Sequence, residues 1–353
     1  MTDQRGVMEE HDEREGPWRK ILLAGTAILG TAAAYNAFAR KGVDQLTNLI
    51  GGEEGGFDWR DRRIAFTKHG EGPPLLLIHG IHASAWSYEW RRNVEALSRR
   101  NTVYTIDLLG FGRSDRPAIR YSARLYISLI SDFVSRVIDA PTVLVASSLS
   151  GAYAIVLAAR DPHRFPGVAL IAPSGLVRLN EPASIGGEAS RLAVDTPIAG
   201  TAMFNALVAR PNLRRYLRNA YSDDSLVTRE LVEVHYATSH QRGARHAPGA
   251  FMSGHLNIDV RTALRRLSAP ALLIWGEEGS AAPVEEFRGF RELKRDLEIS
   301  VLSPAGDLPH DERAEDFNVI LSTWLNRLSL SSALTLVTHP GTHADLPHTP
   351  QLS

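Results

Sequence analysis

The chain has 353 residues, of which 44% are hydrophobic and 22% are charged, and this composition is typical of a globular protein rather than a disordered, collagen-like or coiled-coil one. The absence of cysteine from the sequence excludes disulfides, thiol nucleophiles and zinc–thiolate sites. The 39 basic and 40 acidic residues nearly balance, without a basic stripe, so we do not expect a nucleic-acid partner.

Residues 1–50 are predicted to form an acidic leader followed by an apolar helix. Trp18 introduces an Ala- and Gly-rich apolar run over residues 21–39, about as long as the roughly 20 residues that cross a bilayer. Three interpretations stay open: a membrane anchor, a signal segment that is not cleaved early, and a helix lying on the protein or on a membrane surface. We therefore expect a cytoplasmic protein, with or without membrane contact through residues 18–41.

The next part of the chain predicts a mostly parallel sheet. A Gly-rich linker (Gly51, Gly52, Gly55 and Gly56) precedes the main domain, which is predicted to start near Phe57. Continuous apolar runs are typical of buried parallel strands. They occur at residues 75–79, 102–107, 142–146, 168–172 and 271–275. Apolar residues at helical spacing separate some of these strands, so we expect an α/β fold with helices on both faces of the sheet.

A long interruption of this alternation predicts an inserted helical cap over residues 177–268, because it is too long for a simple crossover. The core is then expected to comprise residues 57–176 and 269–330, and it closes with an amphipathic helix. Residues 338–353 contain several His and Pro residues and are predicted to be a disordered tail.

The segment 143–153, Val-Leu-Val-Ala-Ser-Ser-Leu-Ser-Gly-Ala-Tyr, predicts a buried strand that turns sharply into a helix. At such an elbow the central residue is held in a strained conformation, and small residues are needed two positions before and after it. Ala146 and Ser150 meet this requirement around Ser148, where Gly would be usual. Ser148 is therefore a candidate nucleophile, and a helix N-cap is the alternative interpretation.

A second motif, His79-Gly80-Ile81-His82, follows the first strong strand. The backbone N–H groups of Ile81 and Leu149 are predicted to form an oxyanion hole, which stabilises charge in a tetrahedral intermediate. Gly80, His82 and Ser147 are the candidate substrate-binding residues beside it.

Together with the segment Asp107-Leu-Leu-Gly-Phe-Gly-Arg-Ser-Asp115, these motifs make the chain from Arg62 to about Leu328 resemble the α/β-hydrolase family. The resemblance is to cap-bearing members such as esterases, haloperoxidase-like proteins and C–C bond hydrolases, and it implies the α/β-hydrolase fold with a serine nucleophile. It also implies an acid shortly after a strand ending in Trp-Gly and a histidine in a Gly-His-x-Pro-His-x-Glu segment. Gly279 stands at the usual acid position here, and Asp307 at the usual histidine position.

A serine needs a base to become a nucleophile, and the sequence leaves three candidates open. His310 would be the base if its loop were rearranged, with Glu278 orienting it, or else His310 is structural and Glu278 belongs to a solvated acidic pair. Asp307 would be the base if burial raised its pKa, or else it is a loop-bonding carboxylate.

The third candidate is a histidine from outside the usual position, either His82 or one of the cap histidines. The cap histidines are His235, His240, His246 and His255. We do not expect them to bind a metal, because no tight ligand spacing is present.

The resemblance further implies that a serine at the elbow excludes haloalkane dehalogenases and epoxide hydrolases, which carry an aspartate there. The sequence lacks a Gly-x-Gly-x-x-Gly motif after a strand, so we expect no cofactor. The leading hypothesis is a cofactor-independent hydrolase acting on a small or medium apolar ester, amide or related carbonyl substrate. The alternatives are a catalytically degenerate binding or scaffold protein and, less directly, a lyase or transferase on the same fold.

Overall fold

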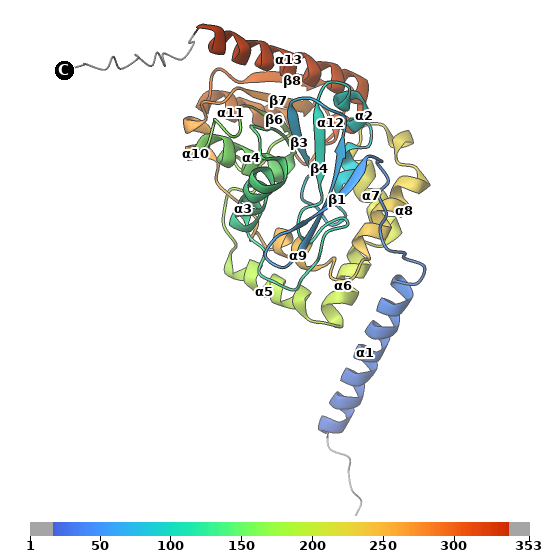
Figure 1. Ribbon diagram of the computed structural model, residues 1–353. Coiled ribbons are helices and arrows are strands. Elements are labelled where there is room, and N and C mark those ends of the chain that lie inside the picture. The colour runs from blue at the N-terminus through green and yellow to red at the C-terminus, as the bar shows by residue number, and fades with distance from the viewer. Residues whose placement is uncertain (1–16, 339–353) are drawn as a thin grey trace, which may run out of the picture.

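The structure, a computed structural model, describes residues 17–338, and side chains within residues 25–329. Its centre is an eight-stranded sheet in the order β1-β2-β4-β3-β5-β6-β7-β8 (Figure 1). The strands are β1 (Glu53–Asp58), β2 (Arg63–His69), β3 (Pro74–Ile78), β4 (Thr102–Ile106), β5 (Val143–Ser147), β6 (Val168–Ile171), β7 (Ala271–Gly276) and β8 (Glu298–Leu302). β2 pairs antiparallel with β1 and β4, and the other neighbours pair parallel. The predicted α/β class with a mostly parallel sheet is confirmed.

Strand β1 corrects the predicted start of the domain. It begins at Glu53, so Gly55 and Gly56 belong to the sheet, and their assignment to a linker is wrong. Gly55 pairs with Phe66 of β2, and a Cβ on Gly55 would lie 2.1 Å from the Phe66 ring. The missing side chain therefore lets the aromatic ring lie over the strand, which a pattern of consecutive residues cannot reveal.

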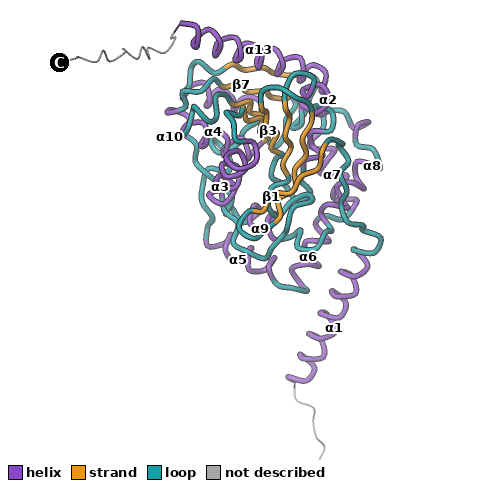
Figure 2. The backbone as a smooth tube through the Cα atoms, in the orientation of Figure 1, coloured by secondary structure: helices purple, strands orange, loops and turns teal. Residues whose placement is uncertain are grey.

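Helices cover both faces of the sheet, as Figure 2 shows. The helices of the core are α2 (Val94–Ser98), α3 (Ala123–Phe133), α4 (Ser148–Arg160), α10 (Arg261–Arg266), α11 (Phe287–Leu293), α12 (Pro309–Glu312) and α13 (Ala314–Thr338). Because successive strand side chains point to opposite faces, each strand contributes to two apolar layers. In β3, Leu76 and Ile78 belong to the layer under α3 and α4, whereas Leu75 and Leu77 belong to the layer under α2 and α13.

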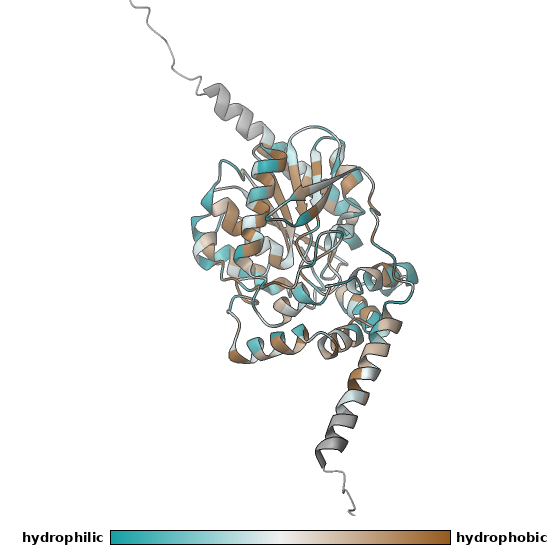
Figure 3. Ribbon diagram, turned by 60° about the horizontal axis from the view of Figure 1, so that its bottom comes forward, coloured by the Kyte–Doolittle hydropathy of each residue, from teal (hydrophilic) through white to brown (hydrophobic). Residues whose placement is uncertain are grey.

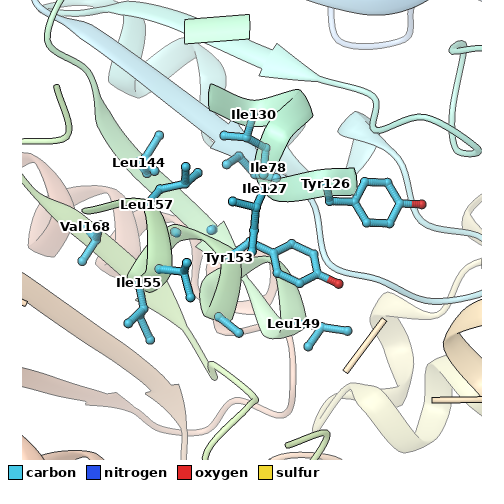
Figure 4. Packing of buried hydrophobic residues seen from close by; sticks show 14 of the residues in the cluster. Ile78, Tyr126, Ile127, Ile130, Leu144, Leu149, Tyr153, Ile155, Leu157 and Val168 are labelled. Atoms are coloured by element: carbon cyan, nitrogen blue, oxygen red, sulfur yellow. The ribbon is translucent and has the colours of Figure 1, made fainter. Parts of the chain in front are cut away.

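The layer under α3 and α4 holds the nucleophile candidate's helix in place. Figure 4 shows part of it, with the rings of Tyr126 and Tyr153 close to one another. Their centroids are 5.9 Å apart, and both side chains are fully buried. Figure 3 shows the same organisation by hydropathy, with hydrophobic residues concentrated on the central strands. This packing makes α4 a rigid support for the residue at its first turn.

Five helices lie within the segment predicted as a cap. They are α5 (Ile185–Asp195), α6 (Ala199–Leu207), α7 (Arg210–Ala220), α8 (Arg229–Ser239) and α9 (His246–Met252). α7 and α8 share a small apolar core of their own, which includes Leu213, Leu217 and Leu231. α10 also falls in the predicted segment, but it packs against α4 of the core.

Helix α1 (Pro17–Ala39) extends away from the body of the molecule, on the side of α6 (Figure 1). Its last turns contact the cap: the Asn36 side chain donates to the Ile198 carbonyl at 3.0 Å, and the Tyr236 hydroxyl donates to the Ala39 carbonyl at 2.6 Å. Within residues 17–338, no helix is both long enough and apolar enough to cross a membrane. The predicted leader up to residue 16 and the predicted tail beyond Thr338 lie outside the described residues.

Candidate active site

Ser148 lies at the junction of β5 and α4 with a backbone φ of +52°. This left-handed conformation is unfavourable for a residue with a side chain and is found where the surrounding structure imposes it. The elbow is tied down from one side by Ser150, whose hydroxyl donates to the His79 carbonyl at 2.6 Å. The serine that replaces the usual glycine at this position therefore bonds the elbow to the His79-Gly80 turn.

The His79-Gly80 turn is held rigidly as well. The His79 Nε2 accepts from the Leu108 N–H at 3.1 Å, so Nδ1 carries the proton that it donates to the Gly80 carbonyl at 2.6 Å. Burial lowers the pKa of His79, which fits this neutral form. The backbone N–H groups of Ile81 and Leu149 donate no hydrogen bond to another group within residues 17–338. They stay the predicted oxyanion-hole donors.

Ser148 opens into a cavity of about 340 Å³ between the sheet edge and the cap. The predicted substrate-binding residues Gly80, His82 and Ser147 line this cavity, and Ile81 lines it too. Most other lining side chains are apolar, and they come from both the core and the cap. They include Leu179, Ala220, Phe251, Ala282 and Leu308. The cavity therefore suits a small or medium, largely apolar ligand.

Asp307 lines the same cavity as Ser148. Its carboxylate accepts from the backbone N–H groups of Ala281 at 2.9 Å and Ala282 at 3.2 Å, and from the Ser280 hydroxyl at 3.3 Å. These donors directly follow Gly279, which stands at the usual acid position. The Asp307 carboxylate, at the usual histidine position, therefore holds this loop through hydrogen bonds. Burial raises the pKa of Asp307, although these hydrogen bonds act in the opposite direction.

The structure does not bring His310 to Ser148. His310 is fully buried in α12, where its ring lies 4.7 Å from that of Trp90, and it does not line the cavity. The imidazole packs against Trp90 and Phe317, which belong to the apolar layer under α13. The predicted partner Glu278 is not beside His310 either, because its carboxylate accepts from the Ala305 N–H at 2.6 Å.

Glu89 is the residue of this region that sequence reasoning missed. It lies in the short helix η1 (Ser87–Trp90), lines the cavity, and accepts from the Gly80 N–H at 2.8 Å through one carboxylate oxygen. The other oxygen lies 3.1 Å from His310 Nε2. Burial alone would raise the pKa of Glu89, but the neighbouring imidazoles, His310 first, lower it to about 2. The only signal in the sequence is an acidic residue within an aromatic segment, Trp86-Ser-Tyr-Glu-Trp90.

The remaining candidate bases are the other histidines. His82 stacks on His235 with 5.9 Å between ring centroids, and burial lowers the pKa values of these residues to about 4 and about 3. His235 Nδ1 lies 2.6 Å from the Ser84 hydroxyl, outside the cavity of Ser148. The other cap histidines, His240, His246 and His255, bond to groups of the cap itself. In the described part of the chain, no cluster of acidic and histidine side chains is suited to hold a metal ion.

The chain is similar in sequence and in fold to several known proteins. A sequence profile of the Alpha/beta hydrolase family matches residues 75–319. A 2-hydroxy-6-oxo-6-(2'-aminophenyl)hexa-2,4-dienoic acid hydrolase of Metapseudomonas resinovorans is 24% identical over 276 residues, which cover 76% of this chain and 89% of that protein. A 2-hydroxymuconate semialdehyde hydrolase of Pseudomonas sp. strain CF600 is 27% identical, covering 72% of this chain and 88% of that protein.

Among solved structures, a meta-cleavage product hydrolase of Pseudomonas fluorescens IP01 superposes with a TM-score of 0.64. It is 23% identical, and the match covers 79% of this chain and 99% of that one. The superposition shows a shared fold.

Proposed function

This chain belongs to the alpha/beta hydrolase family, and from that premise we propose that it is a cofactor-independent hydrolase with Ser148 as its nucleophile. The observation that carries the proposal is the strained Ser148 at the head of α4, facing a cavity of about 340 Å³. Strain of this kind is retained where it serves a function, because it costs folding free energy.

We propose Asp307 as the base, since it lines the cavity of Ser148 and His310 does not. The Asp307 carboxylate takes the hydroxyl proton while the Ser148 oxygen bonds to the substrate carbonyl carbon. The N–H groups of Ile81 and Leu149 stabilise the resulting oxyanion. Collapse of the intermediate breaks the bond to the leaving group, which receives the proton from Asp307. Water then attacks the acyl carbon while Asp307 takes a proton from it. Collapse of this second intermediate breaks the bond to the Ser148 oxygen, which receives that proton, and the acid product is released. A raised pKa makes the carboxylate a stronger base than an ordinary aspartate.

The charges of the cavity limit the proposed substrate. Glu89 and Asp307 both line it, and the guanidinium of Arg178, the only arginine of the described lining, is engaged by Glu286 at 2.7 Å. An anionic substrate would face carboxylates without a free cation. We therefore propose an uncharged apolar ester, amide or related carbonyl compound, in contrast to the dienoic acid named for the Metapseudomonas relative.

The experiment is labelling of the purified full-length chain with a fluorophosphonate, which phosphonylates activated serines. We expect the parent to be labelled and Ser148→Ala to remain unlabelled, with Ser98→Ala on α2 as the matched control that keeps labelling. Asp307→Asn should slow labelling by about 10²–10⁴-fold, the usual contribution of a positioned base. In the parent the rate should fall as the pH drops through the raised pKa of Asp307, because only the carboxylate accepts a proton.

A second function is favoured by the hydrogen bonds of the site. Within the described residues, the Ser148 hydroxyl has no imidazole partner, and the Asp307 carboxylate already accepts from three donors. This pattern fits a binding protein that has lost its catalytic relay. A folded parent that is never labelled would establish this alternative over the hydrolase. Labelling that persists unchanged in Asp307→Asn would instead refute Asp307 as the base.

A further inference from the structure

A second hollow lies far from Ser148, between α1, α6 and the segment that joins α8 to α9. Its volume is about 690 Å³, and it shares no lining residue with the Ser148 cavity. Arg40, Arg242 and Arg245 line this groove, whereas no aspartate or glutamate does. We call it the α1–α6 groove.

The arginines of the α1–α6 groove are available to an anion. Arg40 and Arg242 are exposed, and neither has a carboxylate partner within residues 17–338. Arg245 donates to the Val194 carbonyl at 3.1 Å, which leaves its remaining donors free. Asp195, which follows Val194 in the chain, is already bonded to Arg191 at 2.7 Å and to His246 at 3.1 Å. None of the three groove arginines therefore forms an ion pair with a carboxylate in the described part of the chain.

Exposed apolar side chains occur on the two helices that border the groove. On α1, Phe38 is 74% exposed and Ile28 is 68% exposed, and on the contacting helix α6, Met203 and Leu207 are about half exposed. Single exposed apolar residues need no explanation, but here four of them lie on one projecting helix and on the helix that contacts it. The sequence adds a charge pattern, since residues 17–43 contain basic residues near both ends of α1 and no aspartate or glutamate.

We propose that α1 and the α1–α6 groove dock on an anionic lipid surface, with Arg40, Arg242 and Arg245 at the lipid phosphates. Basic groups bind the phosphates of such a surface, and neighbouring apolar side chains enter the boundary between headgroups and acyl chains. A soluble phosphate compound would use the arginines but would leave Phe38 and Ile28 in water. Helix α1, which carries both of these side chains, extends away from the body of the molecule (Figure 1).

The test is flotation of the full-length chain with vesicles of phosphatidylcholine alone or with 30 mol% phosphatidylglycerol. We expect binding to the anionic vesicles that weakens with added salt. An arginine near such a surface contributes about fivefold in affinity, so Arg40→Glu with Arg242→Glu should reduce binding by at least about 20-fold. The matched control is Arg291→Glu with Arg295→Glu, which changes two exposed arginines in and after α11, away from α1, and should bind like the parent.

The apolar contribution is tested with Phe38→Ser, which should weaken vesicle binding, against Val319→Ser on α13, which should not. Thermal unfolding of each variant shows that the fold is kept. Equal binding of the parent to both vesicle types would overturn the proposal. So would tight binding of glycerol 3-phosphate in solution that vesicles do not improve, since the groove would then serve a soluble phosphate compound. Concentration-dependent dimers abolished by Phe38→Ser, without vesicle binding, would assign the surface to a second copy of the chain.

Discussion

Glu89 connects the His79-Gly80 turn to a buried imidazole. Its carboxylate bonds to the Gly80 N–H at 2.8 Å and lies 3.1 Å from His310 Nε2, so one side chain positions both the predicted oxyanion turn and α12. A Cβ on Gly80 would lie 3.6 Å from Ser148 Cβ and 3.6 Å from the Glu89 carboxylate, so Gly80 lies between these two side chains. We therefore expect Glu89 and His310 to position the turn and α12 rather than to react with a substrate.

Replacing Glu89 with glutamine should make the folded protein less stable at neutral pH. The pKa of Glu89 falls from 4.5 to about 2 on folding, so its ionised form stabilises the protein above pH 4.5, and this stabilisation is lost as the pH falls towards 2. Removing one partner of a buried pair costs about 3–5 kcal/mol, and we expect about 2–3 kcal/mol here because glutamine still accepts from Gly80. Urea unfolding at pH 7 and pH 3 measures the free energy.

The difference between parent and Glu89→Gln should be smaller at pH 3 than at pH 7. Glu95→Gln is the matched control, because the Glu95 side chain on α2 is 89% exposed, and it should change little at either pH. A loss of stability in Glu89→Gln that is the same at both pH values would show that charge is not the cause.

At the scale of elements, the backbone at the end of β7 is in close contact with the loop that follows β8. A Cβ on Gly276 would lie 1.9 Å from the Gly306 carbonyl oxygen and 2.5 Å from that of Ala305. Both are backbone atoms, so neither can move aside as a flexible side chain would. This close approach is what brings Asp307 against the loop of Gly279.

Gly276→Ala should therefore reduce the free energy of unfolding by about 2–3 kcal/mol, since an overpacked core must shift its backbone. Asp307 should also lose its bonds to residues 281 and 282, which would slow fluorophosphonate labelling. Gly30→Ala in α1 is the matched control, because nothing lies within 4 Å of a Cβ there, and it should be neutral or slightly stabilising. Thermal unfolding compares the two, and equal midpoints would contradict the argument.

At the scale of the whole molecule, the Ser148 cavity is formed by the core and the cap together. The core contributes Ser148, and α7 of the cap contributes Tyr216, whose ring centroid lies 5.6 Å from that of His82. The size of an accepted ligand is therefore decided where the cap meets the sheet edge, and side chains of the cap are expected to set specificity.

Tyr216→Ala should enlarge the cavity and favour bulky ligands. We expect the ratio of labelling rates for a bulky and a small phosphonate to rise by about tenfold, the effect that a few atoms have in an apolar pocket. Leu207→Ala on α6 serves as the control, because that side chain is 48% exposed and does not line the cavity. An unchanged ratio in Tyr216→Ala would mean that the cap does not limit ligand size.

Some features of this protein follow from the sequence by itself. The buried strands β3 to β7 and the turn at Ser148 depend on runs of apolar or small residues that are adjacent in the chain, so local patterns predict them. The sequence also predicts Asp307 at the usual histidine position, because this assignment depends only on the order of motifs along the chain.

Only the tertiary structure decided the rest. β1, β2 and β8 lack a continuous buried run, and β1 forms because Gly55 accommodates the Phe66 ring of its neighbour. Packing between segments far apart in the chain decides that Asp307, and not His310, lines the Ser148 cavity. The same kind of packing places Glu89 between Gly80 and His310. Such contacts are selected by shape and charge in three dimensions, and no periodicity along the chain encodes them.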